Sequence, residues 1–252
     1  MNQNEAHFNY ILRLADTNLV LGHRLSEWSG HGPYLEEDIA MTNIALDMIG
    51  QANSLLQHAA KLEGKGRTED DLAYMRNERE FYNTLLSEQK NIDFAFTIVR
   101  QFLSDAFDFH LYKKLESSKD ETLAALAVKG GKEVAYHLRH TAAWMERLGD
   151  GTEESHARLQ TAWNELWAYT ADLFAMNASD RELVKTGIAV DNETIKSAWL
   201  KTVEEVMKKA HLAMPANTWQ HSGSREGKHT EHLGFLLAEM QYLHRTYPQA
   251  QW

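Results

Sequence analysis

The chain has 252 residues, of which 43% are hydrophobic and 25% are charged, and it contains no cysteine. This length fits one large domain or two small ones, and the lack of cysteine excludes disulfides, thiolate metal sites and cysteine nucleophiles. A net charge of -10 argues against nucleic-acid binding, which needs clustered Lys and Arg. Neither a signal-peptide pattern nor an apolar run of ~20 residues is present, so we expect a cytoplasmic protein that does not enter membranes.

The chain begins with two predicted long helices, over residues 4–28 and 33–63. Asn4 is expected to be the N-cap of the first helix, and Pro33 to lie in the first turn of the second, where its missing N–H is tolerated. Gly64 is expected to end the second helix. This second helix is the clearest in the sequence, because apolar residues recur in steps of four and three over three heptads. These residues are Met41, Ala45, Met48, Ala52, Leu55, Ala59 and Leu62.

Three further helices are predicted, over residues 68–88, 91–118 and 120–148. The first of them opens with Thr68 and Asp71, whose spacing predicts a capping box. Gly130 and Gly131 lie inside the third, where glycine is unfavourable. They predict a bulge or a very close helix contact at this point.

The last third of the chain continues the helical pattern around one loop, predicted over residues 211–228. N-caps are predicted at Thr152, Asp191 and Thr230, and a short helix over 178–186. No strand pattern, linker-like segment or short repeat occurs. We therefore predict a single domain over residues 1–252, with an all-α, ferritin-like long-helix bundle and additional C-terminal helices.

A ferritin-like bundle suggests a di-iron site, which needs one Glu from each of two helices and a Glu-x-x-His from each of the other two. The chain contains Glu-x-x-His twice, at residues 153–156 and 226–229. The first lies in the opening turn of a helix and the second in a glycine-containing loop, so neither is expected to bind iron. His229 and His232 flank a predicted helix start and are interpreted as capping and surface contacts.

At the positions where the bundle should carry ligands, the pattern is degenerate. Asp47 is followed three residues later by glycine, and Glu133 by tyrosine, with His137 four residues on. Asp105 lies in an apolar stripe, and Glu27 is the best acid of the first helix. Hydrogen bonding among Asp47, Asp105, Glu133 and His137 is favoured over metal binding, so we predict no catalytic residue and no bound metal or cofactor in this chain.

Several segments resemble the C-type subunits of bacterial multicomponent phenylacetyl-CoA epoxidases. The matching segments are residues 25–31, 43–52, 132–139, 187–191, 229–234 and 237–243. They follow the family's order and extend over essentially the whole chain. This makes the resemblance more specific than any single motif.

The resemblance implies a tight complex with a homologous A-type catalytic subunit, together with the other subunits of the complex. The A-type subunit would carry the di-iron centre and epoxidise phenylacetyl-CoA with O₂, using electrons from a reductase that holds FAD and an iron–sulfur cluster and oxidises NADPH. The C-type subunit would be a non-catalytic structural partner in phenylacetate degradation, and we expect a homodimer when it is alone. Two alternatives stay open: an independent ferritin-like metalloprotein with an atypical carboxylate/His site, and a purely homo-oligomeric helical scaffold.

Overall fold

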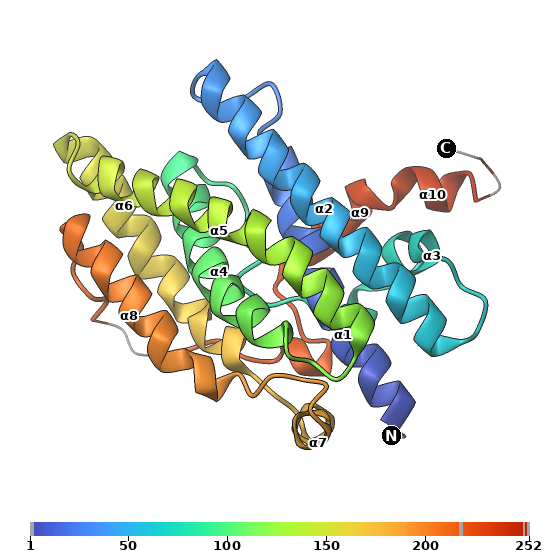
Figure 1. Cartoon of the computed structure of the whole chain (residues 1–252). Coiled ribbons are helices and arrows are strands. Elements are labelled where there is room, and N and C mark those ends of the chain that lie inside the picture. The colour runs from blue at the N-terminus through green and yellow to red at the C-terminus, as the bar shows by residue number, and fades with distance from the viewer. Residues whose placement is uncertain (1–2, 217–218, 249, 251–252) are drawn as a thin grey trace. The chain divides into compact units, whose positions relative to one another are not determined.

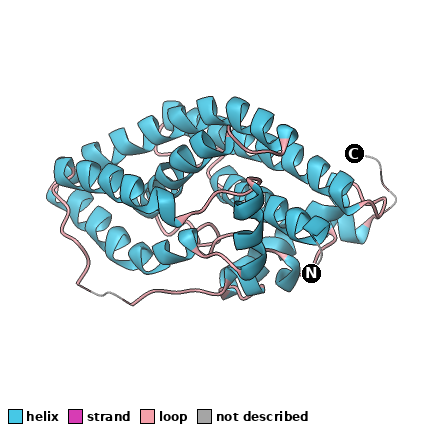
Figure 2. Cartoon of the chain, turned by 60° about the horizontal axis from the view of Figure 1, so that its bottom comes forward, coloured by secondary structure: helices cyan, strands magenta, loops and turns pink. Residues whose placement is uncertain are grey.

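The structure, a computed structural model, describes residues 3–216, 219–248 and 250, and within them every regular element is a helix (Figures 1 and 2). The fold is all-α and ferritin-like with additional C-terminal helices, which confirms the predicted class. Among the described residues, no helix is both long enough and apolar enough to cross a membrane.

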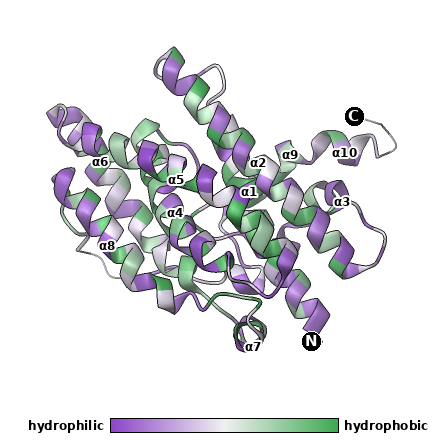
Figure 3. Cartoon of the chain, in the orientation of Figure 1, coloured by the Kyte–Doolittle hydropathy of each residue, from purple (hydrophilic) through white to green (hydrophobic). Residues whose placement is uncertain are grey.

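The chain divides into two compact units. Unit 1 contains Met1–Gln89, Asn177–Lys185 and Gly223–Trp252, and unit 2 contains Lys90–Met176 and Thr186–Ser222. Apolar and polar positions are interleaved along the long helices of both units (Figure 3). This is the pattern of helices that bury one side and expose the other.

Unit 1 is built on an antiparallel hairpin of α1 (Gln3–Ser26) and α2 (Leu35–Glu63) (Figure 1). The predicted seam of α2 is confirmed, because all its members up to Ala59 are buried and Leu62 is half-buried. Gly64 ends α2 in a left-handed conformation (φ 66°), which glycine adopts without a Cβ clash.

The predicted starts of both helices are wrong by a few residues. Asn4 lies inside α1 and is not its N-cap. Pro33 precedes α2, whose N-cap is the extended residue Tyr34. The Asp38 carboxylate accepts a hydrogen bond of 2.9 Å from the Gly32 backbone N–H. This contact holds the entering turn against the first turn of α2 and keeps Pro33 outside the helix.

The predicted helix over residues 68–88 is mostly wrong. The Thr68–Asp71 capping box is confirmed, but α3 (Glu69–Tyr74) has only six residues and is followed by the 3₁₀ turn η1 (Glu78–Glu80). Beyond this turn the backbone is irregular as far as residue 93. The Tyr82 N–H donates a 2.9 Å hydrogen bond to the Asp16 carboxylate of α1. This backbone donor is therefore satisfied by a distant side chain and not by a helical hydrogen bond.

Unit 1 is completed by four shorter elements from later in the chain. These are α7 (Ala178–Thr186), whose last residue falls in unit 2, η3 (Ser224–Glu226), α9 (Glu231–Met240) and α10 (Tyr242–Thr246). The predicted short helix at residues 178–186 is therefore confirmed. Thr230 is the N-cap of α9 as predicted, but its side chain makes no capping hydrogen bond.

Unit 2 packs four helices around buried aromatic side chains. Its elements are α4 (Phe94–Leu115), α5 (Glu121–Gly149), α6 (Glu153–Leu166), the 3₁₀ segment η2 (Trp167–Phe174) and α8 (Glu193–Lys209). The indole N–H of Trp199 on α8 donates to the Leu103 carbonyl of α4 at 3.1 Å, so this buried aromatic residue is also satisfied as a donor.

Most of the predicted boundaries in unit 2 hold, with two corrections. Thr152 caps α6 as predicted. The N-cap of α8 is Asn192 and not Asp191, although the Asp191 carboxylate accepts from the Glu193 N–H at 3.2 Å. No bulge interrupts α5 at Gly130, which is buried within a continuous α-helix.

Candidate functional site

The best-defined candidate residue from the sequence, Asp105, is an almost fully buried acid on α4, with 1% of its surface exposed. Its Oδ1 accepts from Gln101 Nε2 at 2.7 Å, and its Oδ2 lies 2.9 Å from Thr141 Oγ1 on α5. Burial raises the pKa of Asp105 well above its usual range. The two hydrogen bonds oppose this pKa shift, and nearby Asp108 adds to it. The net effect shifts the Asp105 carboxyl group toward its protonated form.

A protonated Asp105 fits the surrounding hydrogen bonds better than a carboxylate does. Thr141 Oγ1 also lies 3.0 Å from the His137 carbonyl oxygen, and a hydroxyl has only one proton to donate. When Asp105 donates to Thr141, the hydroxyl can donate to His137, and both bonds are satisfied. Asp108, one turn further along α4, is also buried, and burial raises its pKa to about 7.

The other predicted positions are placed less tightly. His137 is fully buried on α5, where its carbonyl belongs to the Asp105 network, and Glu133 is half-buried one turn earlier. Asp47 is half-buried on α2 in unit 1, and Glu27 forms an ion pair with Arg24 at 2.7 Å. The structure thus links Asp105 to His137 through Thr141.

These residues do not fit a di-iron centre. Carboxylate ligands bind metal in their deprotonated form, whereas burial raises the pKa of Asp105 and disfavours that form. The hydrogen-bond partners of Asp105 are an amide and a hydroxyl. The bundle pattern also requires histidine three residues after Asp47 and Glu133, but these positions are Gly50 and Tyr136.

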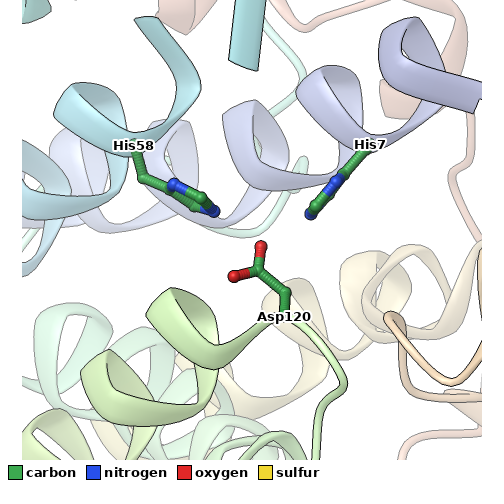
Figure 4. A group of neighbouring side chains, drawn as sticks. All are labelled: His7, His58 and Asp120. Atoms are coloured by element: carbon green, nitrogen blue, oxygen red, sulfur yellow. The ribbon is translucent and has the colours of Figure 1, made fainter. Parts of the chain in front are cut away.

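Two histidines of unit 1 also face one another. His7 on α1 and His58 on α2 have ring centroids 5.9 Å apart in an edge-to-face arrangement (Figure 4). Asp120, also labelled there, belongs to unit 2, where its carboxylate caps α5 by accepting from the Leu123 N–H at 3.0 Å. Within unit 1, this aromatic contact joins the two helices of the hairpin.

Glu88 of unit 1 is a buried acid with several hydrogen-bond donors around it, and the sequence did not single it out. Both its side chain and that of His229 are fully buried. Its carboxylate accepts from His229 Nδ1 at 2.8 Å, from Asn83 Nδ2 at 3.0 Å and from the Thr230 N–H at 2.5 Å. Its backbone carbonyl accepts two further bonds, of 3.1 and 2.9 Å, from the Arg24 guanidinium.

The surroundings of His229 require both ring nitrogens to carry a proton. Nδ1 faces the Glu88 carboxylate, and Nε2 lies 2.9 Å from the Phe81 carbonyl oxygen, which can only accept. Burial alone would lower the pKa of His229. The bonds to Glu88 and Phe81 and the charges of Glu88 and Asp16 outweigh burial and raise that pKa above its ordinary value. The two acceptors and the raised pKa thus both favour the charged imidazolium of His229. Its side chain is buried, so its interpretation as a surface contact is wrong.

A second buried ion pair anchors the C-terminal segment of unit 1. Arg225, in the middle of η3, donates to Asp180 on α7 through Nε at 3.0 Å and also through its terminal nitrogen. Paired charges of this kind hold chain segments in one arrangement, because breaking the pair leaves a charge buried. No chemistry beyond this anchoring follows from the geometry.

Comparisons with known proteins extend over the whole chain. The family model for phenylacetic acid catabolic proteins matches residues 1–252. The C-type subunit of the 1,2-phenylacetyl-CoA epoxidase of Escherichia coli (strain K12) is 48% identical over 252 residues, which is 100% of both chains. The chain therefore belongs to the family of phenylacetic acid catabolic proteins.

Proposed function

We propose that this chain is the C-type subunit of a phenylacetyl-CoA epoxidase and supports the A-type catalytic subunit without catalysing the reaction itself. The full-length similarity to a C-type subunit supports the assignment to the complex. The observation that supports a non-catalytic role is Asp105, a buried acid with a raised pKa that bonds to an amide and a hydroxyl at a predicted ligand position. The proposed pathway is phenylacetate degradation.

The redox groups of the complex would then lie in other chains. We place the di-iron centre in the A-type subunit, and FAD, the iron–sulfur cluster and NADPH binding in the reductase. In this proposal the chain is a cytoplasmic, single-domain protein that forms a homodimer when its partner is absent. Its buried polar networks, including Glu88 with His229, serve to fix its own helices.

Co-expression with the A-type subunit tests the proposal. We expect one co-eluting complex whose iron is retained when Asp105 or Glu133 of this chain is replaced by alanine, provided the variant still binds its partner. Separate elution of the two chains at micromolar concentration would reject the structural role.

Metal analysis of the lone chain tests the alternative of an independent metalloprotein. Close to two irons per chain, lost in Glu133→Ala, would favour that alternative. Intact mass of the lone chain distinguishes a homodimer from a larger homo-oligomeric scaffold.

A further inference from the structure

A row of large apolar side chains is exposed along one side of α2. Leu35 is 71% exposed, Ile39 is 52% exposed and Leu46 is 62% exposed. At 100° per residue, these three positions and Gly50 lie within about 60° of one another on the helix. We call these four residues the outer face of α2.

The outer face is separate from the side of α2 that packs against α1. That packed side contains the buried seam, from Met41 through Ala59. An amphipathic helix that packs against one neighbour needs only one apolar side. The second apolar side of α2 is left uncovered among the described residues, and contiguous exposed apolar surface commonly marks a protein interface.

Gly50 gives independent evidence of contact at this face. It lies in the middle of α2, is exposed, and has no atom within 4 Å of where a Cβ would stand. Glycine weakens a helix interior, and no contact among the described residues requires it here. Gly22 on α1 shows the usual reason for such a glycine, because a Cβ there would lie 2.8 Å from Ile49 Cγ1 and 3.2 Å from the Ala45 carbonyl. Gly50 would allow the same close approach of a neighbouring helix. Among the described residues, however, no helix lies against it.

The charges beside the outer face indicate which partner fits it. Residues 33–60 contain no Lys or Arg, and the exposed Glu36 and half-buried Asp47 lie next to the apolar row. A second copy of this face would bring more acidic residues against them, because Lys61, the one Lys or Arg of α2, lies beyond the end of the face. A helix with apolar contact residues and flanking Lys or Arg would match both the apolar row and its acidic border.

We infer that the outer face of α2 is the docking surface for a helix of the homologous catalytic subunit, with an apolar contact row and a basic rim. This inference rests on the proposed function and adds the surface that would make the contact. Gly50 would let the backbones of the two helices approach closely.

The test uses the full chain and measures its affinity for the purified A-type subunit. Gly50→Gln adds bulk at the outer face while raising helix propensity, so the variant should fold with a Tm at least equal to that of the wild type. We expect Gly50→Gln and Leu46→Arg to weaken binding by at least tenfold. The matched control is Leu243→Arg on α10, which replaces another exposed leucine of unit 1 and should change affinity less than twofold.

The outcomes separate this inference from the proposed function. If the wild type binds the A-type subunit and the two α2 variants bind equally well, the docking surface is wrong and the proposed function stands. If the wild type does not bind it, both fail. A third outcome is that Leu46→Arg abolishes self-association of the lone chain but leaves binding to the A-type subunit unchanged. This result would assign the face to a second copy and overturn the inference.

Discussion

Replacing His229 with glutamine should strongly destabilise the protein. The substitution removes the imidazolium from a fully buried pair and leaves the Glu88 carboxylate with the Asn83 amide and the Thr230 N–H as its remaining donors. Removing one partner of a buried pair costs about 3–5 kcal/mol. Because two donors remain, we expect a loss near the lower end of that range. Urea unfolding followed by circular dichroism measures this free energy.

The same pair predicts a dependence of stability on pH. The pKa of His229 is raised in the folded protein, so its contribution is fully present below the unfolded-state pKa of about 6.5. That contribution is lost as the pH rises through the higher folded-state pKa, because the folded protein then gives up the proton that it bound more tightly. The unfolding free energy of the wild type should therefore fall as the pH rises above about 6.5, and this part of the slope should be absent in His229→Gln.

His211→Gln is the matched control for the buried histidine. The His211 side chain is 66% exposed and lies 3.6 Å from Asp150, an exposed contact of the kind that contributes little to stability. The control should unfold like the wild type at every pH. A His229→Gln protein that keeps the wild-type stability and pH profile would refute the assignment of a buried imidazolium.

Two further predictions concern unit 2 and α2. Asp105→Asn should change the unfolding free energy by less than about 1 kcal/mol at pH 7, because an amide can replace a protonated acid in the same bonds. A loss above about 3 kcal/mol in urea unfolding would show that Asp105 is ionised. Gly149→Ala should cost at least about 1–3 kcal/mol, because its Cβ would lie only 2.2 Å from the Ala210 carbonyl oxygen. Gly50→Ala, in open space, should instead gain up to about 1 kcal/mol, and equal thermal shifts for the two glycine variants would contradict this reasoning.

The long helices could be predicted from the sequence because their signals are local. The seam of α2 from Met41 to Ala59 repeats with the helical period, and Gly64 supplies the left-handed residue that ends the helix. Thr68 and Thr152 cap helices through backbone N–H groups only three residues away. Such contacts depend on neighbouring residues and not on the fold, so pattern alone located them.

The degenerate carboxylate positions were also visible in the sequence, since residue type and spacing suffice to show that histidine is missing at Gly50 and Tyr136. The state of Asp105 was not visible. Its protonation depends on burial and on Thr141, which comes from a different helix. The sequence could therefore name the position but not its chemistry.

What only the tertiary structure decided involves residues far apart in the chain. The helix predicted over residues 68–88 breaks after α3 because Asp16 and Glu88 draw the segment into buried polar networks. Glu88 and His229 are 141 residues apart, so no local pattern pairs them. Periodicity alone located the buried side of α2, because an apolar row repeats there in every turn. Only the packed chain shows that the second apolar row, from Leu35 to Leu46, is more than half exposed at each of its large side chains.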